Sequence, residues 1–252
     1  MSSRPDYGID SPAIVAGLFV LGSTGLGAAL LWHFFGNPRP FWEIALAAGG
    51  GYFWLSAAGM VWYSKLGKLR IRDEILRQIP WRGDEVVLDA GCGRGLLLVG
   101  AARRLTTGKA IGLDRWVPGA LTGNRPEAAL ENARLEGVLE RVEVKAGDVR
   151  QLPFADASLD CVVSNFVVHE LNTRAEREQM LREMVRVLKP GGRLALVDFI
   201  FTDECVRVLH EIGIGDARRE RVGSFFSFWL SAILNFGLVQ TCQVTGSKPA
   251  AS

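Results

Sequence analysis

Two long segments without charged side chains, close to the start of the chain, limit its possible folds more than any other feature. Residues 11–38 and 44–64 contain no Asp, Glu, Lys or Arg. A helix needs about 20 apolar residues to cross the roughly 30 Å hydrocarbon core of a bilayer. Pro12–Phe35 and Phe41–Tyr63 are each long enough. Glycine, asparagine and proline in residues 36–40 predict a tight turn between them.

We therefore expect residues 1–64 to form a transmembrane hairpin with spans at about 12–35 and 41–63. A secretory signal peptide fits poorly. The first ten residues have one basic side chain, Arg4, and two acidic ones, and the apolar run is too long. A hairpin that lies in the membrane interface is the remaining alternative.

Small residues at four-residue spacing occur on both segments, Ser23 with Gly27 and Ala47 with Gly51. Small side chains allow helices to approach closely in a membrane. We expect these pairs to pack helices together, either within the hairpin or between protomers, and the second option predicts a homo-oligomer formed through the transmembrane helices.

Four basic side chains closely follow the second segment: Lys65, Lys68, Arg70 and Arg72. The turn between the segments has only Arg39, so the positive-inside tendency places the turn outside and both termini in the cytoplasm. This predicts a multi-pass protein of the cell (inner) membrane with the lipid bilayer as a partner, and a basic cluster that lies against anionic headgroups. Apolar residues at helical spacing predict an amphipathic linker helix within residues 65–83.

The overall charge and the cysteines exclude several classes of function. The 252 residues include 29 basic and 27 acidic side chains, a net charge of +2, so we expect no nucleic-acid partner. The four cysteines (Cys92, Cys161, Cys205 and Cys242) form no CxxC pair and have no histidine at metal-ligand spacing. We therefore expect buried, reduced thiols and no metal site.

From residue 84 onward, strand patterns alternate with helix patterns. Strands are predicted at 85–89, 109–114, 142–145, 159–166 and 193–200. Helices are predicted at 95–105, 126–136, 174–188 and 204–212, and the run Lys189-Pro190-Gly191-Gly192 is expected to stop the third of them. This alternation predicts an α/β fold over residues 84–252, a Rossmann-like doubly wound, mostly parallel sheet. In such sheets ligands bind at the carboxyl ends of the strands.

Glycines follow the first predicted strand, in the sequence VLDAGCGRG (87–95). Without a Cβ, the backbone at Gly91, Gly93 and Gly95 can turn sharply and approach a ligand. A dinucleotide fingerprint would need glycine at position 96, where the chain has leucine, so a nicotinamide cofactor loses support. Asp89 would repel a pyrophosphate and attract an amino group.

Polar side chains also end the next three predicted strands. Asp114 ends the second, 23 residues after Gly91, where a carboxylate can accept hydrogen bonds from two ribose hydroxyls. Asp148 follows the third strand and Asn165 lies at the end of the fourth. Any one acid alone is compatible with a helix N-cap, but the set with the glycine loop predicts a ligand site.

Together these motifs resemble the class I S-adenosylmethionine-dependent methyltransferases, over residues 84–200. The resemblance rests on VLDAGCGRG (87–95), Asp114, AGD (146–148), LPFADASLDCVVS (152–164) and LREMVRVLKPGGRL (181–194). The KPGG run is similar to the branch that acts on small molecules and lipids, and residues 124–144 resemble membrane-anchored bacterial members. The resemblance implies S-adenosylmethionine as the cofactor.

The resemblance also implies roles at the strand ends. Asp89 and the backbone of Gly91, Cys92 and Gly93 would hold the methionine part, with the glycine amides meeting its carboxylate. Asp114 would bind the ribose hydroxyls.

The adenine and methyl ends of the cofactor have their own expected contacts. Asp148 would accept from the adenine amino group, with Val149 contributing backbone. Trp116 would cover the adenine face, unless it is an ordinary packing residue. Asn165 would line the methyl-donor side, and Gly95 and Arg115 complete the expected cofactor-binding residues.

His169, with Glu170 beside it, follows the fourth predicted strand at the rim of the expected site. An imidazole can act as a general base near neutral pH. His169 is therefore the candidate catalytic residue, and a surface or helix-capping histidine is the alternative.

Residues 223–239 contain no charged side chain and predict either part of the core or an apolar lid beside the site. Together with the hairpin they favour a small lipophilic or lipid-borne acceptor for a membrane-anchored methyltransferase. Two alternatives stay open: a membrane-tethered S-adenosylmethionine-binding protein without turnover, and an NAD-dependent oxidoreductase on a related fold.

Overall fold

The computed structural model describes residues 4–36, 40–119, 121–222 and 241–250. Its main body is a seven-stranded sheet in the order β3-β2-β1-β4-β5-β7-β6. The strands are β1 (Val86–Ala90), β2 (Lys109–Asp114), β3 (Val142–Ala146), β4 (Leu159–Asn165), β5 (Leu188–Asp198), β6 (Arg218–Arg221) and β7 (Cys242–Ser247). Strands β1 to β5 run parallel, and β7 is antiparallel to β5 and β6. The predicted Rossmann-like α/β fold is confirmed.

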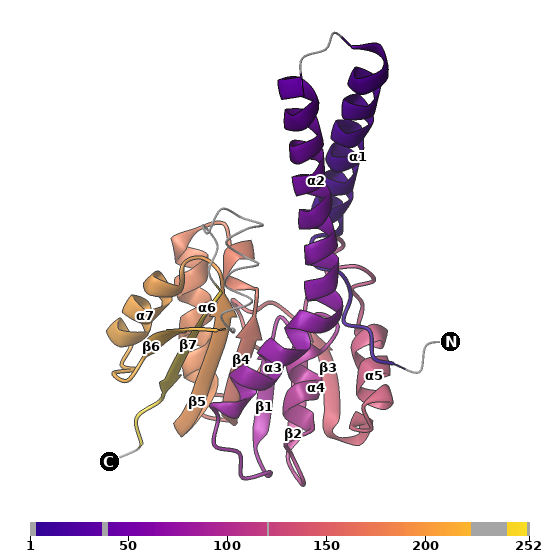
Figure 1. Ribbon diagram of the computed structural model, residues 1–252. Helices are drawn as coiled ribbons and strands as arrows, with labels where there is room; N and C mark the ends of the chain where they lie inside the picture. The colour runs from indigo at the N-terminus through magenta and orange to yellow at the C-terminus, as the bar shows by residue number, and fades with distance from the viewer. Residues whose placement is uncertain (1–3, 37–39, 120, 223–240, 251–252) are drawn as a thin grey trace.

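Helices cover both faces of the sheet (Figure 1). One face carries α3 (Lys68–Arg77), α4 (Leu96–Ala102) and α5 (Pro126–Leu135), and the other carries α6 (Arg174–Val187) and α7 (Thr202–Glu211). Because side chains alternate along a strand, each face has its own buried apolar cluster. Leu76, Leu97 and Ala129 belong to the first cluster, and Met180, Met184 and Leu209 to the second. All four cysteines are buried and free, as the sequence predicts.

The Lys189-Pro190-Gly191-Gly192 run lies inside β5 and does not separate a helix from a strand. Helix α6 ends at Val187, and β5 begins at the next residue, Leu188, instead of at the predicted Arg193. The pairing of β5 with β4 shifts its register within this run, which accommodates the extra residues as a bulge. Gly191, at φ +77°, supplies the left-handed conformation that the bulge needs.

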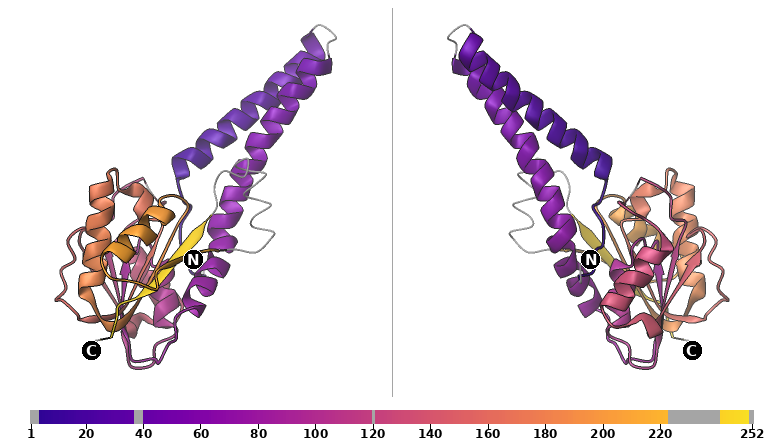
Figure 2. Two further views of the ribbon diagram at one scale, coloured as in Figure 1. Left: turned by 90° about the vertical axis from the view of Figure 1, so that its left-hand side faces the viewer. Right: turned by 90° about the vertical axis from the view of Figure 1, so that its right-hand side faces the viewer.

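Helices α1 (Pro12–Phe35) and α2 (Pro40–Trp62) lie side by side and project away from the sheet (Figures 1 and 2). Both are long and apolar enough to cross a membrane. Only 17% of the apolar window of each helix is buried, so neither is a core helix of the α/β domain. Phe35 is 84% exposed and Leu55 67%, an apolar surface typical of one that a membrane or partner covers. Arg39 and the rest of residues 37–39 lie outside the described residues.

Glycines form the closest contact between α1 and α2. A Cβ on Gly50 would lie 2.6 Å from the backbone nitrogen of Leu26, and one on Gly25 would lie 2.9 Å from the Cα of Gly50. The predicted pairs, Ser23 with Gly27 and Ala47 with Gly51, do not form this contact, because a Cβ on Gly27 or Gly51 would lie in open space. Small residues occur on several faces of both helices, so their spacing alone does not show which face meets the partner.

Helix α2 continues through a π-helical turn, Tyr63–Gly67, directly into α3. The predicted linker helix is therefore continuous with the second apolar helix (Figure 1).

The basic cluster at this junction differs from the prediction. Lys68 and Arg72 are only 4% and 5% exposed and face the protein, where Arg72 pairs with Glu136 at 3.1 Å. Lys65 and Arg70 are exposed. The expectation that the whole cluster lies against lipid headgroups is wrong, because Lys68 binds residues 7–10 and Arg72 binds Glu136 inside the protein.

Gly50→Ala is expected to destabilise the hairpin, because the added methyl group would overlap the backbone of α1. Such overpacking costs about 1–3 kcal/mol, partly offset by the roughly 1 kcal/mol by which alanine favours a helix over glycine. Gly51→Ala is the matched control and should be neutral or stabilising, since its Cβ meets nothing within 4 Å. Thermal unfolding of the full chain in detergent micelles measures both, and the opposite ranking would show that the helices do not meet at Gly50.

Candidate active site

The parallel strands end at one edge of the sheet, and the predicted polar residues meet there. Strands β3, β2, β1 and β4 are successive neighbours, so Asp148, Asp114, Asp89 and Asn165 follow one another along this edge. Ten of the predicted site residues line one cavity: Asp89, Gly91, Cys92, Gly93, Asp114, Arg115, Asp148, Val149, Asn165 and His169. Within the described chain, Gly95 and Trp116 are not among its lining residues.

The loop after β1 needs glycine for steric reasons. Gly91 has φ +80°, and a Cβ there would overlap the side chain of Val167. Gly95, at φ +83°, is the N-cap residue of α4 and would place a Cβ 3.3 Å from Ala129 of α5. Gly91 therefore shapes the cavity wall, whereas Gly95 sets the packing of two helices behind it.

The backbone amides of this loop are already hydrogen-bonded within the protein. The N–H groups of Gly91 and Cys92 donate to the carbonyl of Leu113 at 2.7 and 3.1 Å. The N–H of Gly93 donates to Oδ2 of Asp114 at 2.7 Å. The expectation that these amides meet a ligand carboxylate does not hold, because they fasten the loop to β2.

Asp89, near the end of β1, is 2% exposed and carries an unsatisfied oxygen. Its Oδ2 accepts the N–H of Leu98 at 2.7 Å, whereas its Oδ1 is buried without a hydrogen-bond partner among the described residues. Burial raises the pKa of Asp89 to about 7, although the bond from Leu98 opposes this. An unsatisfied buried acceptor costs about 1–3 kcal/mol, so this oxygen favours a ligand that brings a donor or a cation.

Asp114 connects the glycine loop to the chain after β2. Its Oδ1 accepts the N–H of Trp116 at 2.6 Å, in addition to the bond from Gly93. A carboxylate oxygen can accept two hydrogen bonds, so both oxygens retain capacity for ligand hydroxyls. The indole N–H of Trp116 donates to the carbonyl of Gly93 at 3.1 Å and its ring packs against the apolar cluster. Trp116 thus packs against the protein, and a contact of its ring with adenine stays a prediction.

Asp148, just after β3, is tightly bound by Arg150. The backbone N–H, Nε and Nη2 of Arg150 donate to it at 2.9, 3.0 and 2.6 Å, and Nη1 of Arg115 lies 3.7 Å away. The hydrogen bond from Arg150 holds the pKa of Asp148 below its ordinary value. A ligand amino group at this position would have to share the carboxylate with Arg150.

The partner of His169 was not predicted from the sequence. Asp198, at the end of β5, is fully buried, and both its carboxylate oxygens lie 3.1 Å from Nδ1 of His169. Burial of the ring acts to lower the pKa of His169, but the hydrogen bond and charge of Asp198 outweigh it, so this pKa is raised. Because Nδ1 is engaged, Nε2 is left for the cavity. A signal was present, since Asp198 is the only acid in the predicted strand 193–200.

Two aromatic side chains beside His169 were also missed. The ring centroids of Phe199 and Phe166 lie 4.5 and 6.3 Å from the imidazole, and both residues line the cavity. Phe166 has φ +57°, a conformation that costs a non-glycine residue about 1–3 kcal/mol and is common at functional sites. The rings make the surroundings of His169 apolar.

The cavity extends from the strand ends to the base of the hairpin. Its volume is about 1480 Å³, more than the roughly 300–1,000 Å³ of common small-molecule sites. Apolar side chains of the hairpin that line it are Ile14 and Leu18 of α1 and Phe53 and Met60 of α2. There is therefore room for a second ligand beside a cofactor. The apolar residues 223–239 lie outside the described residues.

Residues 88–196 match the family described as a methyltransferase domain. Residues 88–196 therefore form a methyltransferase domain, which is similar in sequence to methyltransferases and in fold to an S-adenosylmethionine-dependent one. It is 34% identical over 132 residues to methyltransferase GfsG of Streptomyces halstedii, which covers 52% of this chain and 44% of that protein. It is also 34% identical over 119 residues to the ubiquinone/menaquinone biosynthesis C-methyltransferase UbiE of Salmonella newport, covering 47% and 44%.

The methyltransferase domain also resembles solved structures in fold. Geranyl diphosphate C-methyltransferase from Streptomyces coelicolor, in complex with Mg²⁺, geranyl diphosphate and S-adenosyl-L-homocysteine, aligns with a TM-score of 0.55. The alignment covers 77% of this chain and 84% of that chain at 16% identity, so it shows the fold alone. The chain spans less than half the length of the two curated relatives named above.

The residues of the methyltransferase domain fit its cofactor. The free Oδ1 of Asp89 matches the ammonium group of S-adenosylmethionine, and Asp114 retains acceptors for ribose hydroxyls. A nicotinamide cofactor fits poorly, because its pyrophosphate would meet the carboxylate of Asp89 and the loop amides that bind phosphates elsewhere are occupied. The alternative of an NAD-dependent oxidoreductase therefore loses its support.

Binding of S-adenosylmethionine is expected to release a proton near neutral pH. The pKa of Asp89 is about 7 in the free protein, and an ammonium group beside it would lower that pKa. Affinity should therefore rise with pH and level off above about pH 7. Isothermal titration calorimetry in buffers of different protonation enthalpy measures the released proton.

The matched variant for this test is Asp89→Asn, which keeps the shape but not the charge. It should bind the donor at least about tenfold more weakly, a loss of about 1.4 kcal/mol, and without the pH dependence. Equal pH dependence in both proteins would show that Asp89 does not meet the ammonium group.

Proposed function

We propose that the protein is a membrane-anchored enzyme that transfers a methyl group from S-adenosylmethionine to a small lipophilic or lipid-borne acceptor. One observation carries this proposal: a single cavity is lined at one end by the strand-end acids and His169, and at the other by apolar residues of the hairpin. Donor, base and the apolar part of an acceptor can therefore share one cavity.

The residues at the strand ends bind and orient the donor. When bound, S-adenosylmethionine supplies an activated methyl group on a sulfonium. Asp89 holds its ammonium group, Asp114 accepts from its ribose, and Asp148 with Val149 marks the adenine end. Asn165 ends β4, the strand between β1 and β5, and lines the methyl-donor side. Most of the rate enhancement of an in-line displacement comes from holding the methyl donor and the acceptor close together in the reactive orientation.

His169 is the proposed general base for an acceptor that must lose a proton. Asp198 accepts the Nδ1–H hydrogen bond and stabilises the imidazolium that forms after Nε2 takes the proton. The rings of Phe166 and Phe199 lie beside the imidazole and make its surroundings more apolar, which strengthens its interaction with the acceptor proton. This oriented pair favours turnover over a tethered protein that only binds the cofactor.

The hairpin supports both the membrane anchor and the lipophilic acceptor. Its outward apolar surface fits a bilayer, and Ile14 and Leu18 would give an apolar tail a path from the membrane to the cavity. Residues 4–10 contact the α/β domain, so the start of the chain and this domain lie at the same end of the hairpin (Figure 2). Exposed Lys65, Arg70 and Arg77 near this end favour the cytoplasmic side of the cell membrane. A homo-oligomer formed through the hairpin stays a prediction.

His169→Ala is expected to lower kcat about 10²–10⁴-fold, the usual contribution of a general base. In the wild type, the rate should rise with pH as His169 loses its proton, with a midpoint above the ordinary value of about 6.5. Asp198→Asn removes the hydrogen bond to a carboxylate that raises this pKa, so the rise should move to lower pH while the plateau falls. Profiles of kcat against pH at saturating donor measure both effects. Near-normal turnover of His169→Ala would remove the base assignment.

Methyl-labelled S-adenosylmethionine, incubated with the full chain and a total membrane lipid extract, tests the function as a whole. We expect label to enter a discrete product in the organic phase and Asp89→Ala to abolish the transfer. Label only in water-soluble products would contradict the lipophilic acceptor. Donor binding without any transfer would favour the tethered binding protein, and the absence of donor binding would overturn the proposal.

A further inference from the structure

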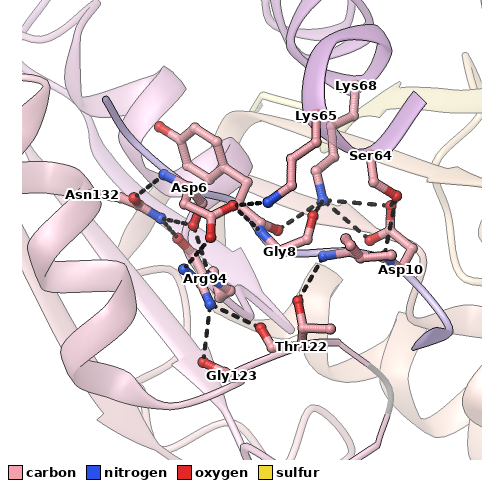
Figure 3. A network of polar contacts seen from close by, with 12 residues as sticks. Asp6, Gly8, Asp10, Ser64, Lys65, Lys68, Arg94, Thr122, Gly123 and Asn132 are labelled. Carbon is pink, nitrogen blue, oxygen red and sulfur yellow. Dashed lines mark hydrogen bonds and ion pairs between the residues drawn. The ribbon is translucent and has the colours of Figure 1, made fainter. Parts of the chain in front are cut away.

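The residues that precede the first apolar helix lie along the methyltransferase domain, as Figure 3 shows. We name residues 4–10 the N-terminal strap. The backbone N–H of Asp6 donates to Oδ1 of Asn132 at 2.8 Å, and Nδ2 of Asn132 donates back to the carbonyl of Asp6 at 2.9 Å. The hydroxyl of Tyr7 donates to Glu136 at 2.7 Å. Tyr7 is 5% and Asn132 2% exposed, so the strap is packed into the domain.

The strap contacts the glycine loop through Arg94. Nε of this residue donates to the carbonyl of Asp6 at 2.8 Å, and Nη2 lies 3.3 Å from the carboxylate of Asp6. Nη1 donates to the carbonyl of Thr122 at 2.8 Å (Figure 3). Arg94 lies between Gly93 and Gly95, and it links the glycine loop to the strap and to the segment that contains Thr122.

The strap also pairs with the chain that follows β2. The N–H of Ile9 donates to Oγ1 of Thr122 at 2.8 Å, and the N–H of Thr122 donates to the carbonyl of Ile9 at 3.1 Å. Asp10 and Leu121 form an antiparallel bridge next to them. Leu121, Tyr7 and Asp10 all line the cavity that holds the donor residues. The strap and its partner loop are thus part of the donor-site wall.

Lys68 holds the strap to the base of the hairpin. Its ammonium group, in a side chain only 5% exposed, donates to the carbonyls of Tyr7 and Gly8 at 2.7 and 3.0 Å and lies 3.3 Å from Asp10. Ser64 adds a hydrogen bond to the same carboxylate at 3.1 Å. Charge-assisted bonds of this kind are strong when water is excluded, so the position of the strap depends on the helix that carries Lys68.

We propose that Lys68 and Arg94 are positioning residues for the donor site: they hold the strap against the glycine loop, so that donor binding and the seating of the strap at the base of the hairpin are coupled. Coupling of this kind is reciprocal. A seated strap strengthens donor binding, and a bound donor keeps the strap seated. This inference does not depend on the identity of the acceptor.

The first arm of the test compares the affinity for S-adenosylmethionine among three variants of the full chain in detergent micelles. Lys68→Met should raise the Kd about tenfold, within the range common for coupled sites. Thr122→Val, which removes the side-chain acceptor for the N–H of Ile9, should weaken binding in the same direction. Lys65→Met is the matched control: its ion pair with Asp6 is about half exposed, so the Kd should change less than about threefold.

The second arm measures the hydrogen exchange of the strap, whose dependence on the donor would not change if Lys68 only stabilised the fold. Hydrogen exchange of the wild-type strap, followed by mass spectrometry, should slow when S-adenosylmethionine is added, and this protection should be reduced in Lys68→Met. At saturating donor, kcat of Thr122→Val should return to near the wild-type value, so that the loss appears in KM for the donor.

Two results would overturn the proposal. The first is donor affinity in both Lys68→Met and Thr122→Val equal to that of Lys65→Met. The second is strap exchange in the wild type that is the same with and without the donor. If Lys68→Met does not fold, Thr122→Val and the wild-type exchange still decide between coupling and independence.

Discussion

The parallel direction of β1 to β5 is the constraint on which the rest of this protein depends. It brings residues far apart in the sequence to one edge of the sheet, where Asp114, Asp89, Asn165 and Asp198 lie at or next to the ends of the successive strands β2, β1, β4 and β5. It also leaves that edge free of crossing helices, so a cavity can form there and extend to the hairpin. No single segment of the chain contains the site.

Much of the fold and about half of the site chemistry could be predicted from the sequence, because they follow from local patterns. Alternating strands and helices, the glycine loop and the acids at strand ends each lie within a few residues of one another. The pairing of those groups was not predictable in the same way. Asp198 becomes the partner of His169 only because β4 and β5 are adjacent. The amides of the glycine loop donate to the carbonyl of Leu113 only because β1 and β2 are adjacent.

In the hairpin, too, the helices could be predicted from composition, whereas the contacts that they make could not. Two charge-free segments are enough to predict two apolar helices, since the length and hydrophobicity of a segment can be read without knowing what it packs against. The contact at Gly50 depends on the rotation of one helix against the other, which small residues on several faces do not specify. Lys68 was assigned to the membrane surface by its position next to the second helix, but a carbonyl 61 residues earlier in the chain binds it inside the protein.

The strap gives the assembly of this protein a definite order. Its residues precede the hairpin in the chain, yet Asp6 needs Asn132, which follows 126 residues later. The hairpin and the early strands can form from nearer contacts, whereas closing a loop of this length carries a larger entropic cost and waits for α5. The strap side of the donor site is therefore completed only after α5 has been made, so a shorter chain would carry its apolar helices before it could hold a cofactor.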